Sequence, residues 1–339
     1  MARSEVHDQL DRPLKDLRIS IMDRCNFRCT YCMPKEVFGP DYAFMDSEEL
    51  LSFDEIVELA TAFAHLGVNK LRITGGEPLL RKDVAQLIGR LDAIDGIEDI
   101  AMTTNAVMLP RLAQPLKEAG LRRVNISFDA LSVATFQQMS GRKTKPEAVI
   151  RGIQAAKNAG LGVKVNMVVQ RGVNEHEVIP MAKYCKDERV TLRFIEFMDV
   201  GQTNGWDFSQ VVSKKELYER VSTIAPLRAQ EEDYFGEVAS RYAYDDGSNV
   251  EVGFISSVTE TFCGTCTRAR LSADGKLFTC LFSERGTDLK SDVRNGMSAT
   301  QLRERIHRIW NNRSDRYSEL RTNESAKQRK KIEMSYIGG

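Results

Sequence analysis

Histidine is scarce in this sequence, and its positive and negative charges balance. The four histidines, His7, His65, His176 and His307, lie far apart and none pair at helical spacing, so we expect no histidine-based metal site. The 48 basic residues match the 48 acidic ones. A chain without net charge has no overall field that would favour a nucleic acid or a membrane surface as its partner.

Several common targeting and binding patterns are also missing. Residues 1–10 are polar and of mixed charge, unlike a signal peptide, and no apolar run approaches the length of a membrane span. No G-x4-G-K-[ST] motif occurs, so a bound nucleotide would be held by side chains rather than by a P-loop. With 42% hydrophobic and 28% charged residues, the 339-residue chain should form one large or two modest globular domains.

Six of the seven cysteines fall into two triplets. The first, Cys25, Cys29 and Cys32, has the spacing C-x3-C-x2-C, with an aromatic residue before the third cysteine. Three thiolates this close can hold three corners of a cubane iron–sulfur cluster and leave its fourth iron open for chemistry. The pattern resembles that of the radical S-adenosylmethionine (SAM) enzymes. Zinc is the alternative, but zinc sites usually have C-x2-C pairs and a further Cys or His nearby.

The second triplet consists of Cys263, Cys266 and, after thirteen intervening residues, Cys280. Alone, this spacing suits zinc about as well as iron–sulfur, but beside the first triplet it indicates an auxiliary cluster with its own open iron. Thiolate clusters without a targeting segment imply a reducing cytoplasm, where disulfides are rare. The remaining Cys185 lies in an amphipathic helical pattern and should be a small buried hydrophobic residue.

Strand-like and helix-like segments alternate over the first two hundred residues. One helical pattern begins at Ser52 with a capping box, and two others end at Gly120 and Gly160. Such βα units predict an α/β fold with parallel strands, but six units are too few to close an eight-stranded barrel. We therefore expect an open, partial (β/α)6 TIM-like barrel that another part of the chain covers. The expected strands span residues 17–22, 70–74, 99–104, 122–128, 162–169 and 190–198.

Hairpin signals replace this alternation after about residue 200. Asp-Gly pairs at residues 246–247 and 274–275 each lie between strand-like runs, and two cysteines of the second triplet flank the second pair. We expect two domains. Residues 1–200 would form the partial barrel with the first cluster. Residues 201–339 would form an α+β extension that carries the second cluster, closes the barrel and ends in a Gly-Gly tail.

Polar and apolar residues alternate along several of the expected strands. Lys70, Arg72 and Thr74 share one face, and Leu71 and Ile73 share the other. The apolar faces should pack against the outer helices, which turns the polar faces into the lumen. Because a lumen lined with cations is costly to bury empty, we expect a cavity for a polar, anionic ligand. The alternative is a set of edge strands with one solvated face.

Two short motifs lie where a ligand would bind. The GGEP motif at residues 75–78 follows a predicted strand at the end where barrel active sites lie. Paired glycines let the backbone approach a ligand closely, although GG before Pro is otherwise only a turn. Arg268 and Arg270 alternate on one strand face beside the second cysteine pair. Arginine forks suit phosphate oxygens, so we favour phosphate binding over a solvated face.

Together these motifs resemble the GTP 3′,8-cyclase family of radical SAM enzymes, which opens molybdenum-cofactor biosynthesis. The N-terminal triplet and the GGEP motif would specify only the superfamily. The second triplet, the TRAR run at residues 267–270 and the terminal Gly-Gly specify the cyclases. The resemblance covers nearly the whole chain, and no motif position departs from it. Matching runs lie at residues 23–34, 71–78, 103–105, 125–127, 193–198 and 262–270.

The resemblance implies two [4Fe–4S] clusters and SAM as cofactors, with GTP as substrate. A 5′-deoxyadenosyl radical from SAM would remove the C3′ hydrogen of GTP, and the ribose radical would attack guanine C8. The product would be (8S)-3′,8-cyclo-7,8-dihydroguanosine 5′-triphosphate. Cys25, Cys29 and Cys32 would hold the first cluster, and Cys263, Cys266 and Cys280 the second, whose open iron would dock the purine. SAM would contact Tyr31, Gly76, Ser127 and Met198. GTP would contact Arg18, Lys70, Arg72, Thr103, Lys164, Arg268, Ala269 and Arg270.

Arg193, Gly338 and Gly339 are the remaining candidates for catalysis. Arg193 would position the intermediate or donate a proton, and the glycine tail would thread into the cavity, where the alternative is a frayed end. The resemblance also implies an external electron donor, a homodimer, and a cyclic pyranopterin monophosphate synthase acting downstream. The rival functions are a peptide-maturing radical SAM enzyme, which usually has more cysteines, and a zinc-binding scaffold, which would be colourless.

Overall fold

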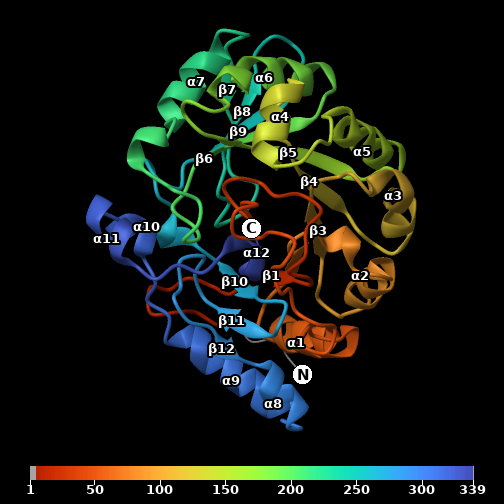
Figure 1. The fold of residues 1–339 in the computed structure, drawn as a ribbon. Coiled ribbons are helices and arrows are strands. Elements are labelled where there is room, and N and C mark those ends of the chain that lie inside the picture. The colour runs from red at the N-terminus through yellow and green to blue at the C-terminus, as the bar shows by residue number, and fades with distance from the viewer. Residues whose placement is uncertain (1–4, 339) are drawn as a thin grey trace.

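One curved sheet of twelve strands forms the framework of the protein, which we describe from a computed structural model for residues 5–338. Neighbouring strands follow the order β12-β11-β10-β1-β2-β3-β4-β5-β6-β9-β8-β7, and the two ends of this series do not meet, so the barrel is open. Figure 1 shows the sheet as an arc with α1 to α6 on its outer side and the C-terminus inside it. The strands are β1 (Asp16–Ser20), β2 (Lys70–Thr74), β3 (Asp99–Thr104), β4 (Arg123–Ser127), β5 (Gly162–Val169), β6 (Thr191–Glu196), β7 (Leu227–Ala229), β8 (Ser240–Tyr244), β9 (Glu251–Ile255), β10 (Arg268–Leu271), β11 (Lys276–Phe278) and β12 (Thr287–Asp288).

The helices of the first half cover the outer face of the sheet. In α1, Ser52 caps the first turn in a capping box with Glu55, and Ile56, Leu59 and Phe63 are buried on one side. The helices are α1 (Phe53–His65), α2 (Val84–Asp92), α3 (Leu109–Glu118), α4 (Val133–Ser140), α5 (Glu147–Asn158), α6 (Val178–Asp187), α7 (Lys214–Ser222), α8 (Lys290–Arg294), α9 (Ala299–Asn311), α10 (Tyr317–Leu320), α11 (Asn323–Gln328) and α12 (Met334–Ile337).

The six strands expected from the sequence are confirmed, each within two residues of the predicted bounds. Both predicted hairpins also form: β8 pairs antiparallel with β9, and β10 with β11. Their turns include Gly247 and Gly275, each with a positive φ that glycine adopts without strain. Cys185 on α6 is buried, as its amphipathic pattern predicts.

The second half of the chain extends the barrel at both edges. β9 adds parallel to β6, and β10 adds parallel to β1. The parallel part of the sheet is therefore longer than the six strands that we expected. The physical reason is that each edge of a six-stranded sheet presents unpaired backbone groups, which a later strand can satisfy. The C-terminal residues thus become walls of the barrel rather than a lid laid over it.

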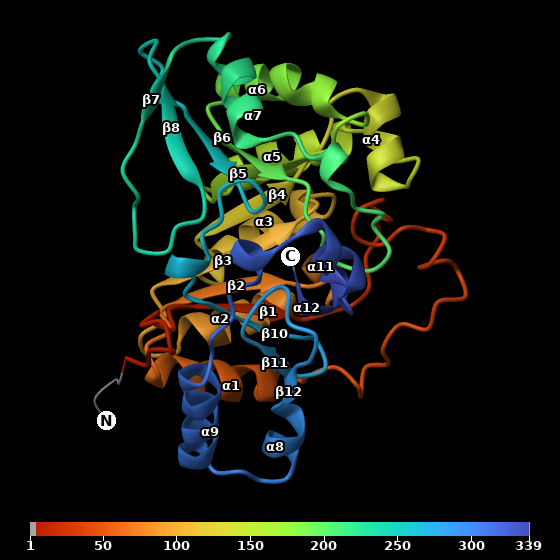
Figure 2. The same cartoon turned by 90° about the vertical axis from the view of Figure 1, so that its left-hand side faces the viewer.

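Further C-terminal elements pack against the barrel from outside and from within. Helix α9 contacts α1 below the sheet, and α12 contacts β1. Figure 2 shows α8 and α9 beneath the strands, with α12 beside β1. Within residues 5–338, no helix is long and apolar enough to cross a membrane.

Candidate active site

A cavity at the carboxyl ends of the parallel strands brings the two cysteine triplets together. The first triplet lies in the loop after β1, whereas Cys263 and Cys266 precede β10 and Cys280 follows β11. All six of these cysteines line the same cavity. Residues more than two hundred positions apart therefore meet because β10 pairs with β1. Cys185 lies outside the cavity, on a helix that covers the outer face.

Backbone hydrogen bonds shape the loop of the first triplet. The amide of Cys32 donates to the carbonyl of Cys29 at 3.0 Å, and the amide of Phe27 donates to the sulfur of Cys25 at 3.4 Å. From beneath the loop, Arg28 donates through Nη1 to the carbonyl of Cys25 at 2.7 Å. The loop is therefore ordered by the chain itself, with its sulfurs turned toward the cavity.

The glycines of the GGEP motif allow two loops to touch. The amide of Gly76 donates to the carbonyl of Met22 at 2.6 Å. A Cβ added at Gly76 would lie 2.2 Å from the carbonyl oxygen of Arg24. A side chain here would push the loop after β2 away from the segment that leads into the first triplet. Glycine at position 76 is thus required for the packing of these two loops. From the sequence we expected glycine here for another reason, the close approach of the backbone to a ligand.

Glu77 of the same motif links the ends of β2 and β3 from a buried position. Its carboxylate accepts from Thr104 Oγ1 at 2.7 Å, from the amide of Asn105 at 2.8 Å and from the amide of Leu79 at 3.1 Å. Burial raises the pKa of Glu77 to about 7 in spite of these donors. Asn105 donates in turn to Asn26 at 2.7 Å, which ties the end of β3 to the first triplet.

Burial is the main influence on the thiol groups of the first triplet. Burial raises the pKa of Cys25 and of Cys32 to about 12, and it raises the pKa of Cys29 well above the usual range. Buried thiols become good ligands when a metal takes the place of the proton. No three His, Cys, Asp or Glu side chains in residues 5–338 converge on a single metal ion. Three cysteines around one cavity fit the larger cubane.

The second triplet has a different electrostatic setting. Burial raises the pKa of Cys280 to about 11. Burial also opposes ionisation of Cys266, but the cations Arg268 and Arg313 outweigh it and lower the pKa of Cys266 to about 6. Arg268 also lies over the ring of Phe262, 4.9 Å from its centroid. This triplet, too, offers three sulfurs to the cavity and fits a cluster with one open iron.

Six arginines line the cavity beside the cysteines. Desolvation and repulsion from Arg270 and Arg72 hold the pKa of Arg18 well below its ordinary value. Burial and the neighbouring Arg268 lower the pKa of Arg270 to about 10. The Nε atoms of Arg18 and Arg72 have no hydrogen-bond partner in the described part of the chain. Buried cations without partners are costly, so the cavity favours an anionic ligand. The six are Arg18, Arg72, Arg193, Arg268, Arg270 and Arg313.

Three of the residues expected to contact GTP do not line this cavity. Lys70 points its Nζ at the ring of Tyr234, 3.0 Å from the centroid, and borders a second hollow near the start of β1. Lys164 lies on β5, where burial and repulsion from Arg193 and Arg123 lower its pKa to about 8. Ala269 is fully buried and alternates with its two arginine neighbours on β10.

The remaining predicted side chains stand around the cavity. Five of the residues that we expected to contact SAM or GTP line the cavity: Tyr31, Gly76, Thr103 on β3, Ser127 and Met198. The hydroxyl of Tyr31 donates to Asp129 at 2.7 Å, which orients the ring that precedes the third cysteine. Burial raises the pKa of Asp129 to about 6.

Arg193 is held in place by a carboxylate that the sequence analysis did not identify. Its Nη2 lies 3.2 Å from Glu237 Oε1, and both side chains are buried. Glu237 and Tyr234 belong to an irregular segment between β7 and β8, where no periodic pattern marks which side chains turn inward. The functional role of Glu77 was also missed, although its place in the GGEP motif was a usable signal.

The C-terminal tail enters the cavity from above β2. Arg270 Nη1 donates a hydrogen bond to the carbonyl of Gly338, and Met334 lines the cavity. A Cβ at Gly338 would lie 2.2 Å from Thr74 Cγ2, and the φ of Gly338 is +74°. Glycine is therefore required at this position by both space and backbone conformation. Gly339 lies outside the described residues.

Comparisons with known proteins agree with this arrangement. Residues 19–185 match the Radical SAM superfamily, and residues 190–319 match the family described as Molybdenum Cofactor Synthesis C. A protein of Staphylococcus haemolyticus (strain JCSC1435) called "GTP 3′,8-cyclase" is 51% identical over 339 residues, which is 99% of each chain. A protein of the same name from Staphylococcus aureus (strain MRSA252) is 50% identical over 338 residues, again 99% of each chain.

Among solved structures, SuiB of Streptococcus suis bound to S-adenosylmethionine has a similar fold. The TM-score is 0.62 at 12% sequence identity, over 88% of this chain and 69% of that one. A second SuiB structure gives a TM-score of 0.60 at 13% identity, over 89% of this chain and 67% of that one. At such low identity the likeness shows a shared fold alone.

Proposed function

The chain belongs to the GTP 3′,8-cyclase family, and we propose that its cavity carries out the reaction for which that family is named. GTP would be converted to (8S)-3′,8-cyclo-7,8-dihydroguanosine 5′-triphosphate, the first step of molybdenum-cofactor biosynthesis. The observation that carries this proposal is one cavity lined both by two cysteine triplets and by six arginines. The triplets suit two clusters, and the arginines suit the charge of a triphosphate.

Two [4Fe–4S] clusters and SAM complete the site. Cys25, Cys29 and Cys32 would hold the first cluster, and Cys263, Cys266 and Cys280 the second. When bound, the first cluster and SAM supply a carbon radical that removes the C3′ hydrogen of GTP. The proposed SAM contacts are Tyr31, Gly76, Ser127 and Met198, which all line the cavity.

The protein's own contribution is binding, orientation and exclusion of water. Arg18, Arg72, Arg268 and Arg270 would bind the triphosphate, and Lys70 and Lys164 would add charge from the wall behind them. The lining also includes Phe27, Phe136 and Met139, which shield the reacting atoms from solvent. A radical attacks any C–H bond within reach, so placement within about 3–3.5 Å matters more here than acid–base catalysis.

Arg193 and the tail are the proposed positioning groups nearest the reaction. Glu237 fixes one face of the Arg193 guanidinium, which leaves its other N–H donors free to orient the nucleotide or the cyclised intermediate. The carbonyl of Gly338 accepts from Arg270, so the tail limits where that arginine can point. Both groups would act on orientation, and Arg193 would also donate a proton.

The setting of the reaction is part of the proposal. An external one-electron donor would reduce the first cluster, and a cyclic pyranopterin monophosphate synthase would consume the product. We also propose a cytoplasmic homodimer, because clusters held by cysteine thiolates need a reducing compartment and the family resemblance implies two subunits.

An anaerobic assay tests the proposal. Protein reconstituted with iron and sulfide is incubated with SAM, dithionite and GTP, and the products are separated and identified by mass spectrometry. We expect 5′-deoxyadenosine together with a cyclised product of the same mass as GTP. Deoxyadenosine formed equally with and without GTP would remove GTP as the substrate and leave the radical chemistry. Loss of both products from protein with intact clusters would contradict the mechanism.

A further inference from the structure

A buried group of charged residues lies directly behind the second cysteine triplet, and one of its members, Arg313, also borders the cavity. Asp8, Arg12 and Arg313 come from the N-terminal segment and from the segment after α9. Their side chains are 0%, 1% and 1% exposed. Charged groups are rarely buried this completely unless they are paired, and nothing in the proposed reaction uses them.

The carboxylate of Asp8 joins the two guanidinium groups. Arg12 Nε and Nη2 both lie 2.7 Å from Asp8 Oδ2, and Arg313 Nη1 lies 3.0 Å from the same oxygen. The other carboxylate oxygen accepts from the amides of Leu10 and Arg12 at 2.9 and 3.0 Å. The carboxylate therefore fixes both arginines and its own segment of backbone.

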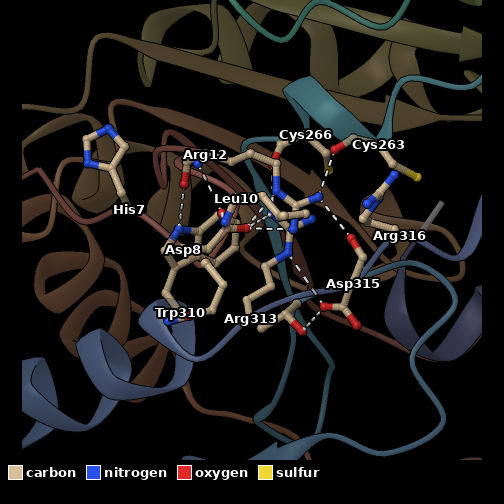
Figure 3. A network of polar contacts seen from close by, with 12 residues as sticks. His7, Asp8, Leu10, Arg12, Cys263, Cys266, Trp310, Arg313, Asp315 and Arg316 are labelled. Carbon is tan, nitrogen blue, oxygen red and sulfur yellow. Dashed lines mark hydrogen bonds and ion pairs between the residues drawn. The ribbon is translucent and has the colours of Figure 1, made fainter. Parts of the chain in front are cut away.

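Each arginine also donates to the backbone of one cysteine. Arg12 Nη1 donates to the carbonyl of Cys263 at 2.7 Å, and Arg313 Nη1 donates to the carbonyl of Cys266 at 2.8 Å. Figure 3 shows the two guanidinium groups side by side, with the two cysteines above them. Both ends of the short 3-10 turn Cys263–Thr265 are thus held by cations that share one anion.

Two further contacts extend the network toward the third cysteine. Arg12 Nη1 donates to the carbonyl of Asp315 at 2.9 Å. The carboxylate of Asp315 accepts from the hydroxyl of Thr279 at 2.6 Å and lies 3.5 Å from Arg313 Nε. Thr279 precedes Cys280 in the sequence. The Trp310 indole donates to the carbonyl of Arg12 at 3.0 Å and stacks against Arg313, which closes the network from below.

We propose that Asp8, Arg12 and Arg313 are positioning residues of the second triplet, which hold the Cys263–Cys266 turn ready for a cluster and set the reduction potential of that cluster. The inference rests on the proposed assignment of this triplet to a [4Fe–4S] cluster. The network holds both ends of the turn through the chain's own side chains. The cationic ends of the arginines face the cysteine turn and the Asp8 carboxylate lies behind them. Potentials of such clusters depend on nearby charge and hydrogen bonding.

Opposite charge changes give the sharpest test. In a background with Cys25, Cys29 and Cys32 replaced by alanine, any cluster signal belongs to the second triplet. Iron content and the midpoint potential from an EPR-monitored redox titration are then measured for Arg313→Met and Asp8→Asn. Arg313→Met removes a cation and should lower the midpoint potential. Asp8→Asn removes the anion and should raise it. Both variants should release iron to a chelator faster than the reference protein. Arg313→Lys keeps the charge and should restore most of the potential while iron is still lost faster.

Arg28 supplies the matched control, because it makes the same kind of contact with the first triplet through the carbonyl of Cys25. Arg28→Lys should leave the potential of the second cluster unchanged. Shifts of Arg313→Met and Asp8→Asn in the same direction, or no shift in folded and iron-loaded protein, would overturn the proposal. Reference protein that binds no iron at all would instead overturn the cluster assignment and this inference with it. Circular dichroism and thermal melting establish that each variant is folded.

Discussion

Arg270 donates a hydrogen bond to the carbonyl of Gly338, so the last described residue of the chain lies against a cation of the cavity wall. The residues are 68 positions apart, and both are buried. The contact links the end of the chain to β10, the strand that follows the second triplet. It also places the tail beside β2, because Gly338 lies against Thr74.

Replacing Gly338 by alanine should displace the tail. The new Cβ would clash with Thr74 and the residue would be strained at a φ of +74°. We expect turnover to fall at least about tenfold, because a shift of about 1 Å near reacting atoms costs up to a hundredfold in rate. Iron content should be unchanged. Turnover is measured as the cyclised product formed per minute by reconstituted protein.

Gly172→Ala is the control for backbone strain alone. Gly172 has a φ of +76° with nothing within 4 Å of an added Cβ. This variant should lose some stability but keep its turnover. Equal losses of turnover in both variants would show that strain, and not the position of the tail, explains the effect.

Each cysteine triplet should account for half of the bound iron. Cys25→Ala and Cys263→Ala should each reduce the iron per chain to about half, because one cubane is lost and the other remains.

Cys185→Ala should keep all of the iron and lower stability by about 1 kcal/mol, the cost of a small cavity in the core. Iron analysis and thermal melting measure these effects. Iron lost from Cys185→Ala would contradict the separation of this residue from the sites.

Local patterns were enough to predict the strands of the first half of the chain. Each strand of the first half has its own alternation, and the capping box at Ser52 is read from four adjacent residues. The face of β2 that carries Arg72 could be assigned because side chains alternate strictly along a strand. These features depend on neighbours in the sequence, and the structure confirms them.

Contacts between distant segments could not be predicted in this way. That β10 pairs with β1 and β9 with β6 depends on which edges remain free once the barrel has formed. The same limit applies to Glu237, which lies in irregular backbone and forms an ion pair with Arg193 on β6. Lys70 is a further example of a contact between distant segments that could not be predicted. Its strand face was assigned correctly, but the ring of Tyr234 draws its ammonium group away from the main cavity.

Removing a cavity arginine should weaken the binding of the triphosphate and spare the nucleoside. Arg72→Met removes a cation whose Nε has no partner in the described chain. We expect GTP affinity to fall about tenfold to a hundredfold, since a charge-assisted hydrogen bond contributes roughly 1.5–3 kcal/mol, whereas guanosine affinity should be unchanged. Isothermal titration of both ligands against iron-loaded protein measures the difference.

Arg123→Met is the matched control for that experiment. Arg123 lies on β4 and forms an ion pair with Asp99 on the neighbouring strand, outside the residues that line the cavity. Its loss should leave the affinities for GTP and guanosine near those of the unsubstituted protein. Weaker binding of both ligands by Arg72→Met would mean that this arginine supports the site as a whole.

Lys164 predicts how GTP binding depends on pH. Burial, followed by repulsion from Arg193 and Arg123, lowers the pKa of Lys164 to about 8. A bound triphosphate would favour the charged form, so the free enzyme must take up a proton on binding once the pH exceeds 8. The dissociation constant for GTP should therefore be flat below pH 8 and rise by up to about tenfold per pH unit above it.

The same pKa fixes the sign of the effect on stability in the absence of ligand. The pKa of Lys164 lies below its unfolded value of 10.5, so the unfolded chain binds more protons between the two values. This lysine should therefore contribute increasing stability as the pH rises from about 8 to about 10.5. Lys164→Arg stays charged throughout this range and should lose both effects: its GTP affinity should not fall above pH 8, and its melting temperature should not gain the added increase. Parallel pH profiles for the two proteins would show that Lys164 neither titrates in this range nor contacts the triphosphate.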